Sequence, residues 1–214
     1  MSDFDVRTIP TTVHGRYLVR DGPPERLLIG FHGYGETAEA HMAELRQIPG
    51  IDRWTAVALQ ALHPFYMNRT GMIVASWTTS LDRELAIDDN RAYVHSVVAQ
   101  FPPLRQLVFL GFSQGAAMAY RAASGSTATG VIALGGDVPP EVVESRPKLP
   151  PVLIGRGIRE EWYTDEKLQK DLRFLREVTT VSTCVYDGAH EWTSEFRDAA
   201  GEFLTRQLVD QSAE

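Results

Sequence analysis

The chain has 214 residues, of which 43% are hydrophobic and 23% charged, and its formal net charge is −7. These values are ordinary for a globular protein, and the acidic balance argues against a nucleic-acid partner, which requires clustered lysine and arginine. No apolar run approaches the roughly 20 residues of a membrane span, and residues 1–7 lack the apolar core of a signal peptide. We therefore expect a cytoplasmic protein without a membrane span, in which the single cysteine, Cys184, forms no internal disulfide.

Short apolar runs alternate with amphipathic helical patterns along the chain. In chain order, strands are predicted at 13–19, 27–31, 56–59, 107–110, 131–134, 152–154 and 183–186. Helices are predicted around 94–101, 168–175 and 194–208, while Pro139-Pro140 is expected in a loop. This alternation predicts an α/β fold with a mostly parallel sheet of about seven strands and helices on both faces. No linker divides residues 1–214, so we expect one domain with a frayed tail at about 209–214.

The most informative motif is Gly111-Phe112-Ser113-Gln114-Gly115, which joins a predicted strand to a predicted helix. A serine at so sharp a turn adopts a strained backbone, and glycines two residues before and after it relieve the crowding. The pattern G-x-S-x-G in this context indicates a hydrolase nucleophile. In the alternative interpretation, Ser113 only caps the helix.

A second glycine-rich motif, His32-Gly33-Tyr34-Gly35-Glu36, follows the strand predicted at 27–31. Attack by a serine on an ester builds an oxyanion, and backbone N–H groups are its usual donors. The donors expected here are the N–H groups of Tyr34 and Gln114. We assign His32 a structural role, because the base of such an enzyme comes late in the chain.

Of the six histidines, only His190 follows Ser113 in the sequence. It lies in a loop after the last predicted strand, where the imidazole can reach the same edge of the sheet as the serine. The order nucleophile, acid, histidine is that of a G-x-S-x-G hydrolase, so His190 is predicted to be the general base.

The acid should lie between Ser113 and His190 at the end of a strand, and two loops qualify. One carries Asp137, and the other carries Glu160 and the adjacent Glu161. The residues alone leave this choice open, because most Asp and Glu side chains are simply solvated.

The chain resembles the phospholipase/carboxylesterase family of α/β-hydrolases, which includes acyl-protein thioesterases. The resemblance covers about 27–204 and rests on the two glycine-rich motifs, on Ser76-Trp77 and on Gly188-Ala189-His190. It implies an α/β-hydrolase fold and a serine carboxylesterase without metal or organic cofactor. The family's Gly-x-x-Asp pattern falls on 157–160, which implies Glu160 as the acid, with glutamate in place of aspartate.

Aromatic and apolar residues near these motifs suggest an accessible cleft for small esters rather than bulky lipids. The predicted pocket residues are Tyr66, Met72, Trp77, Trp162 and Trp192. The expected partner is a small-molecule ester, and a homodimer is compatible with the sequence.

Three other activities stay open. They are an acyl-protein thioesterase or lysophospholipase, an enzyme like dienelactone hydrolase, and a ligand-binding protein of the same fold without catalysis. Ser113 counts against the second, whose relatives carry cysteine at that turn. The substituted acid is the one feature that favours the third.

Overall fold

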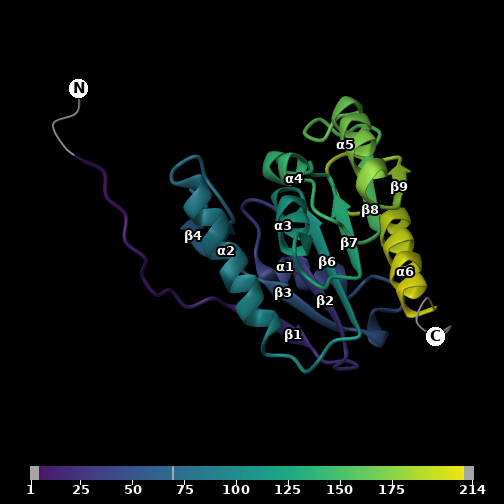
Figure 1. The fold of residues 1–214 in the computed structure, drawn as a ribbon, viewed down its shortest axis with the longest axis horizontal. Helices are drawn as coiled ribbons and strands as arrows, with labels where there is room; N and C mark the ends of the chain where they lie inside the picture. The colour runs from purple at the N-terminus through teal and green to yellow at the C-terminus, as the bar shows by residue number, and fades with distance from the viewer. Residues whose placement is uncertain (1–4, 69, 210–214) are drawn as a thin grey trace.

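The computed structural model describes residues 5–68 and 70–209, so residues 210–214 of the expected tail lie outside the described residues. The elements are shown in Figure 1. The strands are β1 (Tyr17–Arg20), β2 (Arg26–Phe31), β3 (Thr55–Leu59), β4 (His63–Tyr66), β5 (Ile73–Ser76), β6 (Gln106–Phe112), β7 (Gly130–Leu134), β8 (Val152–Gly157) and β9 (Val181–Tyr186). The helices are α1 (Ala38–Leu45), α2 (Arg83–Val98), α3 (Gln114–Ala123), α4 (Pro140–Ser145), α5 (Asp165–Val178) and α6 (Ser194–Val209), with a 3₁₀ turn at Ile51–Arg53.

Seven strands form one sheet in the order β1-β3-β2-β6-β7-β8-β9. Only β1 runs antiparallel to its neighbour, pairing Tyr17 with Leu59, and the remaining pairs are parallel. The predicted fold class is therefore confirmed. Because parallel strands end at the same edge, the loops after β2, β6, β7, β8 and β9 gather at one side of the molecule.

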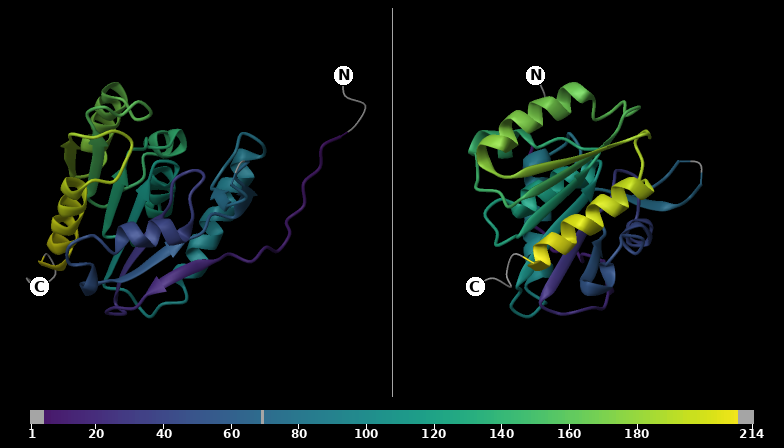
Figure 2. Two further views of the ribbon diagram at one scale, coloured as in Figure 1. Left: turned by 180° about the vertical axis from the view of Figure 1, so that it is seen from behind. Right: turned by 90° about the vertical axis from the view of Figure 1, so that its right-hand side faces the viewer.

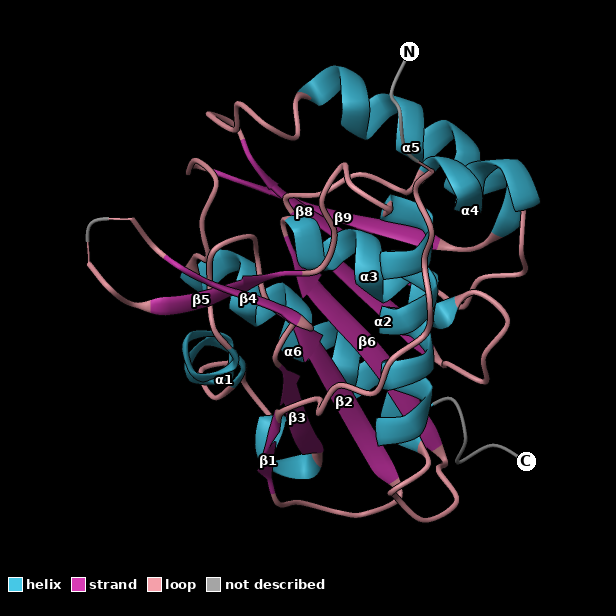
Figure 3. Cartoon of the chain, turned by 90° about the vertical axis from the view of Figure 1, so that its left-hand side faces the viewer, coloured by secondary structure: helices cyan, strands magenta, loops and turns pink. Residues whose placement is uncertain are grey.

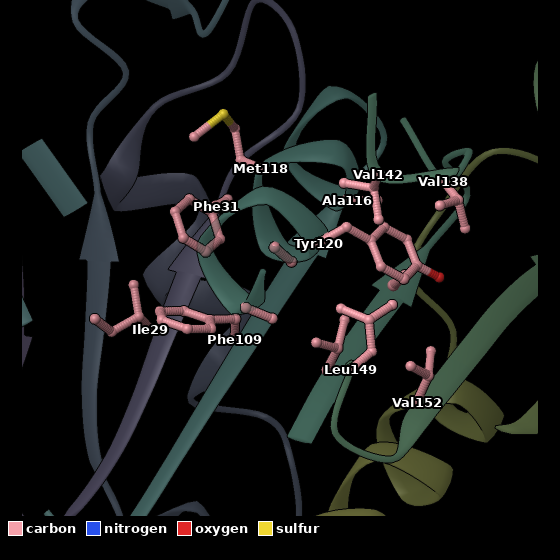
Figure 4. Packing of buried hydrophobic residues seen from close by; sticks show 14 of the residues in the cluster. Ile29, Phe31, Phe109, Ala116, Met118, Tyr120, Val138, Val142, Leu149 and Val152 are labelled. Atoms are coloured by element: carbon pink, nitrogen blue, oxygen red, sulfur yellow. The ribbon is translucent and has the colours of Figure 1, made fainter. Parts of the chain in front are cut away.

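Helices cover both faces of this sheet, as expected (Figure 2). Side chains alternate along each strand, so that Ile29 and Phe31 belong to the buried cluster on the face of α2, α3 and α5, whereas Leu28 belongs to the cluster on the face of α1 and α6. Figure 4 shows Phe31 and Phe109 near each other in this core, and their ring centroids are 5.9 Å apart. Buried strands of this kind read as continuous apolar runs, which is why most were predictable.

The structure corrects the prediction at the start of the first strand. β1 begins at Tyr17, not at residue 13. The chain crosses α2 just before it, where a Cβ on Gly15 would lie 2.2 Å from the ring of Tyr93. The Tyr93 hydroxyl donates to the Arg16 carbonyl at 2.6 Å. Tyr17 already pairs with Leu59, the last residue of β3, and the Arg16 carbonyl accepts the Gln60 N–H at 2.9 Å, so β3 offers no further partner to the residues before Tyr17.

Other elements were absent from the prediction. Strands β4 and β5 pair as an antiparallel hairpin that projects from the main sheet (Figure 3). Its first strand contains Pro64 and its side chains are largely exposed, so no alternating pattern marks it. Helices α1 and α4 were also missed. Pro140, expected in a loop, is the first residue of α4, a position that needs no backbone N–H.

Helix α3 approaches the ends of β2 and β6 closely at Gly115. A Cβ there would lie 2.0 Å from the carbonyl oxygen of Phe31. Backbone on both sides cannot yield as a flexible side chain would, so a side chain at this position forces the helix off the sheet.

We expect Gly115→Ala to lower the free energy of unfolding by roughly 3 kcal/mol, since it overpacks a rigid contact. Gly125→Ala is a matched control, because Gly125 has φ +75° but open space around its Cβ position. Its cost should be limited to backbone strain of about 1 kcal/mol. Urea unfolding of both variants measures the difference, and equal losses would contradict the close approach of α3.

A buried carboxylate lies beneath the loop after β7. Asp171 of α5 accepts hydrogen bonds at 3.0 Å from the Val138 N–H and at 3.0 Å from the Tyr163 hydroxyl. Burial raises the pKa of Asp171 to about 6, against the opposing effect of the Val138 hydrogen bond. The folded state therefore binds a proton here at a pH where the unfolded chain does not.

This shift predicts that the Asp171 contribution to stability falls as pH rises from about 4 to about 6, the interval between the unfolded and folded pKa values. Asp171→Asn keeps one acceptor oxygen but cannot titrate. Relative to this variant, the wild-type protein should gain stability as pH is lowered from 7.5 toward 4, as measured by urea unfolding at several pH values. A stability difference that is constant with pH would refute the assignment.

Candidate active site

Ser113 stands at the junction of β6 and α3 with φ 54° and ψ −119°, a conformation that only a constrained turn imposes on a non-glycine residue. The two flanking glycines explain how it is tolerated. A Cβ on Gly111 would lie 2.0 Å from the Gly115 carbonyl oxygen. The Ser113 N–H donates to the Leu134 carbonyl at 2.8 Å, which ties the turn to β7. The geometry is that of a nucleophile elbow.

His190 and Glu160 lie in the loops that follow β9 and β8. Nδ1 of His190 is 2.6 Å from Oε2 of Glu160. The Glu160 side chain is buried, and its other oxygen accepts the Trp162 N–H at 2.8 Å and the Tyr163 N–H at 3.3 Å. Both carboxylate oxygens are therefore occupied, and the imidazole is oriented from its Nδ1 side.

The other two carboxylates considered for the acid lie elsewhere. Asp137 pairs with Nζ of Lys167 at 3.1 Å and is about half exposed, and Glu161 is exposed to solvent. Among Asp137, Glu160 and Glu161, Glu160 is the one in contact with His190.

Two glycines at the end of β7 bring the serine and the histidine together. A Cβ on Gly135 would lie 3.1 Å from His190 Cε1 and 3.3 Å from Glu160 Oε2. A Cβ on Gly136 would lie 2.4 Å from the Ser113 carbonyl oxygen. Sequence reasoning treated this loop only as a source of the acid Asp137. Its Gly-Gly pair was the signal of close packing around the site.

Aromatic packing joins the turn at Ser113 to the His190 loop. The ring of Phe112 lies 4.8 Å from that of His190, centroid to centroid. Among the described residues the Ser113 hydroxyl has no hydrogen-bond partner, and catalytic hydrogen bonds are often long before a substrate binds.

His32 has the bracing position expected of it. Its Nδ1 donates to the Gly33 carbonyl at 2.7 Å, and its Nε2 accepts the Ala61 N–H at 3.1 Å. Burial lowers the pKa of His32, which keeps the ring neutral in this arrangement.

The two candidate oxyanion donors belong to the loop that follows His32 and to the start of α3. Tyr34 is next to the tip of a turn in which Gly35 has φ +72°, and Gln114 is the first residue of α3. Nearby, burial raises the pKa of Glu36, opposed by the hydrogen bond from the Gly33 N–H and by the charge of His190. Sequence reasoning missed the side-chain roles of Glu36 and Gln114, for which only their place in the motifs was a signal.

A cavity of about 600 Å³ opens beside Ser113. Polar and charged side chains line much of it: Arg83, Gln114, Arg121, Asp137, Glu144, Lys167, Lys170 and Asp171. Its apolar wall consists of Ala117, Val138, Pro139, Pro140 and Val143, together with the ring of Trp162.

The predicted pocket residues have different positions. Trp162 lines the cavity and is 73% exposed. Trp192 packs behind the site, with its ring centroid 6.1 Å from that of Phe112. Tyr66 and Met72 are exposed on the β4–β5 hairpin and do not line this cavity.

The structure corrects the prediction that Trp77 lines the substrate pocket. Its side chain has no exposed surface, because the ring packs against Phe31 at 5.4 Å between centroids. Its indole N–H donates to the His32 carbonyl at 2.8 Å. Trp77 is therefore a core residue that supports the loop carrying Tyr34.

Within residues 5–68 and 70–209, no group of three or more His, Cys, Asp or Glu side chains could hold a metal ion. In the same ranges, no helix has the length and apolar character needed to cross a bilayer.

Comparison with solved structures identifies the fold. The structure is similar to esterase PE8, with 23% identity, a TM-score of 0.76, and coverage of 91% of this chain and 99% of that one. It is also similar to acyl-protein thioesterase 2 of Zea mays, with 18% identity, a TM-score of 0.71, and coverage of 91% and 100%. A carboxylesterase of Bacillus cereus shares 13% identity at a TM-score of 0.70, with coverage of 90% and 94%. At these identities the likeness establishes an α/β-hydrolase fold.

No curated protein sequence matches the chain at a significant level. The model of the phospholipase/carboxylesterase family matches residues 18–205, which include the elbow, the Gly33–Glu36 turn and the His190 loop. The chain therefore belongs to the phospholipase/carboxylesterase family of hydrolases.

Proposed function

We propose that this protein is a serine carboxylesterase that hydrolyses small carboxylic esters through Ser113, His190 and Glu160. The observation that carries the proposal is the 2.6 Å contact between His190 and Glu160, next to a strained serine at the same edge of the sheet. Membership in a family of esterases and thioesterases supports it. A cytoplasmic location and a homodimer stay predictions.

In the proposed mechanism, Glu160 accepts the Nδ1–H of His190 and so leaves Nε2 as the proton acceptor. His190 takes the proton of Ser113 as its oxygen attacks the ester carbonyl. The resulting oxyanion accepts hydrogen bonds from the Tyr34 and Gln114 N–H groups. Protonated His190 then gives its proton to the departing alcohol, which leaves an acyl group on Ser113. Water, activated by His190, hydrolyses this acyl-enzyme and restores the free serine.

The alternatives make different use of the same site. A thioesterase uses the same steps, with a thiol in place of an alcohol as the leaving group. The only support for this activity among the comparisons reported above is the name of the Zea mays structure, acyl-protein thioesterase 2. The charged cavity favours short esters over long acyl chains. The contact of Glu160 with His190 supports a hydrolase over a purely ligand-binding role.

Replacing the nucleophile gives the first test. Ser113→Ala should lower kcat for p-nitrophenyl acetate by at least about 10³-fold, since triad knockouts leave only binding and oxyanion contributions. Its thermal unfolding should match that of the wild-type protein. A fluorophosphonate probe should label wild-type Ser113 and not the variant. Residual activity within tenfold of wild type would exclude Ser113 as the nucleophile, and labelling without turnover would favour a binding protein.

Replacing the acid distinguishes the three candidate carboxylates. Glu160→Gln should lower kcat by about 10²- to 10⁴-fold, because an amide in place of the carboxylate can hold His190 in the wrong tautomer and does not stabilise the imidazolium. Asp137→Asn and Glu161→Gln are matched controls, each expected to stay within about threefold of wild type, since neither contacts His190. A larger loss in Asp137→Asn than in Glu160→Gln would move the acid to the β7 loop.

Ester chain length tests the substrate class. We expect kcat/KM to be highest between p-nitrophenyl acetate and butyrate and to decline for decanoate, because a long chain would meet charged side chains in the cavity. An open apolar channel would instead contribute up to about 0.8 kcal/mol per methylene. A steady rise in kcat/KM from two to twelve carbons would favour the thioesterase or lysophospholipase activity.

A further inference from the structure

The two candidate oxyanion donors come from distant parts of the chain but are tied to one short segment. This segment, residues 75–78, comprises the last two residues of β5 and the two that follow. On one side it contacts the loop that carries Tyr34, and on the other it contacts the side chain of Gln114. Neither contact involves the reacting groups Ser113 and His190.

The Tyr34 loop uses all but one of its N–H groups for its own support. The Gly33 N–H donates to Oε2 of Glu36 at 2.7 Å. The Glu36 N–H donates to the Gly33 carbonyl at 3.3 Å, and the Gly35 N–H donates to the Ala75 carbonyl at 3.0 Å. The Ala75 N–H returns a bond to the Glu36 carbonyl at 3.0 Å. Among the described residues, the Tyr34 N–H has no acceptor and is left for a ligand.

The Gln114 side chain is anchored in a similar way. Its Oε1 accepts the Trp77 N–H at 2.9 Å and lies 3.3 Å from the Ser76 hydroxyl. Its Nε2 donates to the Thr78 carbonyl at 2.8 Å and lies 3.2 Å from the same hydroxyl. Both ends of the amide are therefore occupied. The backbone N–H of Gln114 has no partner among the described residues.

The segment is itself fixed in the core. Trp77 is fully buried and donates through its indole to His32. The buried side chain of Asn90 in α2 donates to the Trp77 carbonyl at 2.8 Å. The anchor for the two donors is thus a rigid part of the molecule rather than a mobile loop tip.

We infer that Glu36 and the Gln114 side chain are positioning residues, which hold the two oxyanion donors at a set separation through residues 75–78. The inference rests on the proposed function and adds to it two side chains whose polar atoms contact the supporting segments rather than the substrate carbonyl. Donors stabilise an oxyanion only when they are already aimed at it, at about 2.7 to 3.1 Å. A displacement of about 1 Å in such a site can cost about 10²-fold in rate.

The test compares Glu36→Ala and Gln114→Ala with wild-type protein. Turnover of p-nitrophenyl acetate gives kcat and KM, and a trifluoromethyl ketone measures oxyanion binding directly, because its adduct with Ser113 carries the negative oxygen. Both variants should lose roughly 10- to 100-fold in kcat with KM within about threefold, and the inhibition constant of the ketone should rise by a similar factor. Glu36→Gln keeps an acceptor for the Gly33 N–H and should recover most of the activity.

Matched controls are Glu166→Ala and Gln169→Ala, two exposed positions on α5. They should leave kcat, the ketone inhibition constant and the melting temperature unchanged. Ser76→Ala removes two contacts to Gln114 without altering the Tyr34 loop. A weaker ketone complex in Ser76→Ala at an unchanged melting temperature supports the inference, even if Glu36→Ala fails to fold.

The inference is overturned if Gln114→Ala and Ser76→Ala keep kcat and the ketone inhibition constant within twofold of wild type. It is also overturned if the melting temperature falls while ketone binding is unaffected, because the side chains would then serve stability alone. Fluorophosphonate labelling separates these results from failure of the proposed function. Wild-type protein that is labelled and active, with unaffected variants, refutes only the positioning role. Wild-type protein that is neither labelled nor active refutes both.

Discussion

The close approach of α3 to the ends of β2 and β6 is the constraint on which the site depends. Gly111 and Gly115 permit it, because any side chain at either position would collide with backbone. The helix can then begin directly after the strand, and Ser113 is forced into its strained turn. The same approach brings the first N–H of α3 next to the loop that follows β2. The positions of the proposed nucleophile and of one proposed oxyanion donor thus follow from one packing contact.

Parallel pairing of the strands places the other loops of the site at the same edge of the sheet as Ser113. The loops after β2, β6, β7, β8 and β9 all leave the same edge, and they supply in turn Tyr34, Ser113, Gly135, Glu160 and His190. The glycine pair after β7 lets neighbouring loops close over it without a side chain between them. Ser113 and His190, which are 77 residues apart in the chain, therefore lie at the same edge of the sheet. The parallel sheet places these loops near one another, and the glycines after β7 allow them to make contact.

Sequence reasoning identified those parts of the fold and site that leave local or ordered signals. Buried parallel strands appear as apolar runs, the elbow as a five-residue pattern, and His190 as the only histidine after Ser113. The contact of Glu160 with His190 could not be derived from the residues alone, because Asp137 and Glu161 are also acidic residues in loops that follow predicted strands between Ser113 and His190. Family resemblance supplied that choice. The site role of these residues stays a proposal, whereas the fold and the family are established.

The features that could not be predicted from the sequence depend on tertiary packing. Trp77 looked like a pocket residue because nothing local distinguishes a core tryptophan from one at a cleft. The β4–β5 hairpin carries a proline and exposed side chains, so no periodicity marked it. Yet the last two residues of this hairpin and the two that follow form the segment 75–78, which contacts both Glu36 and Gln114. Residues 75–78, of which the family resemblance marked only Ser76-Trp77, thus link the two glycine-rich motifs. Motifs can identify candidate reacting groups, but the link between the two proposed oxyanion donors runs through contacts of residues 75–78 that no motif describes.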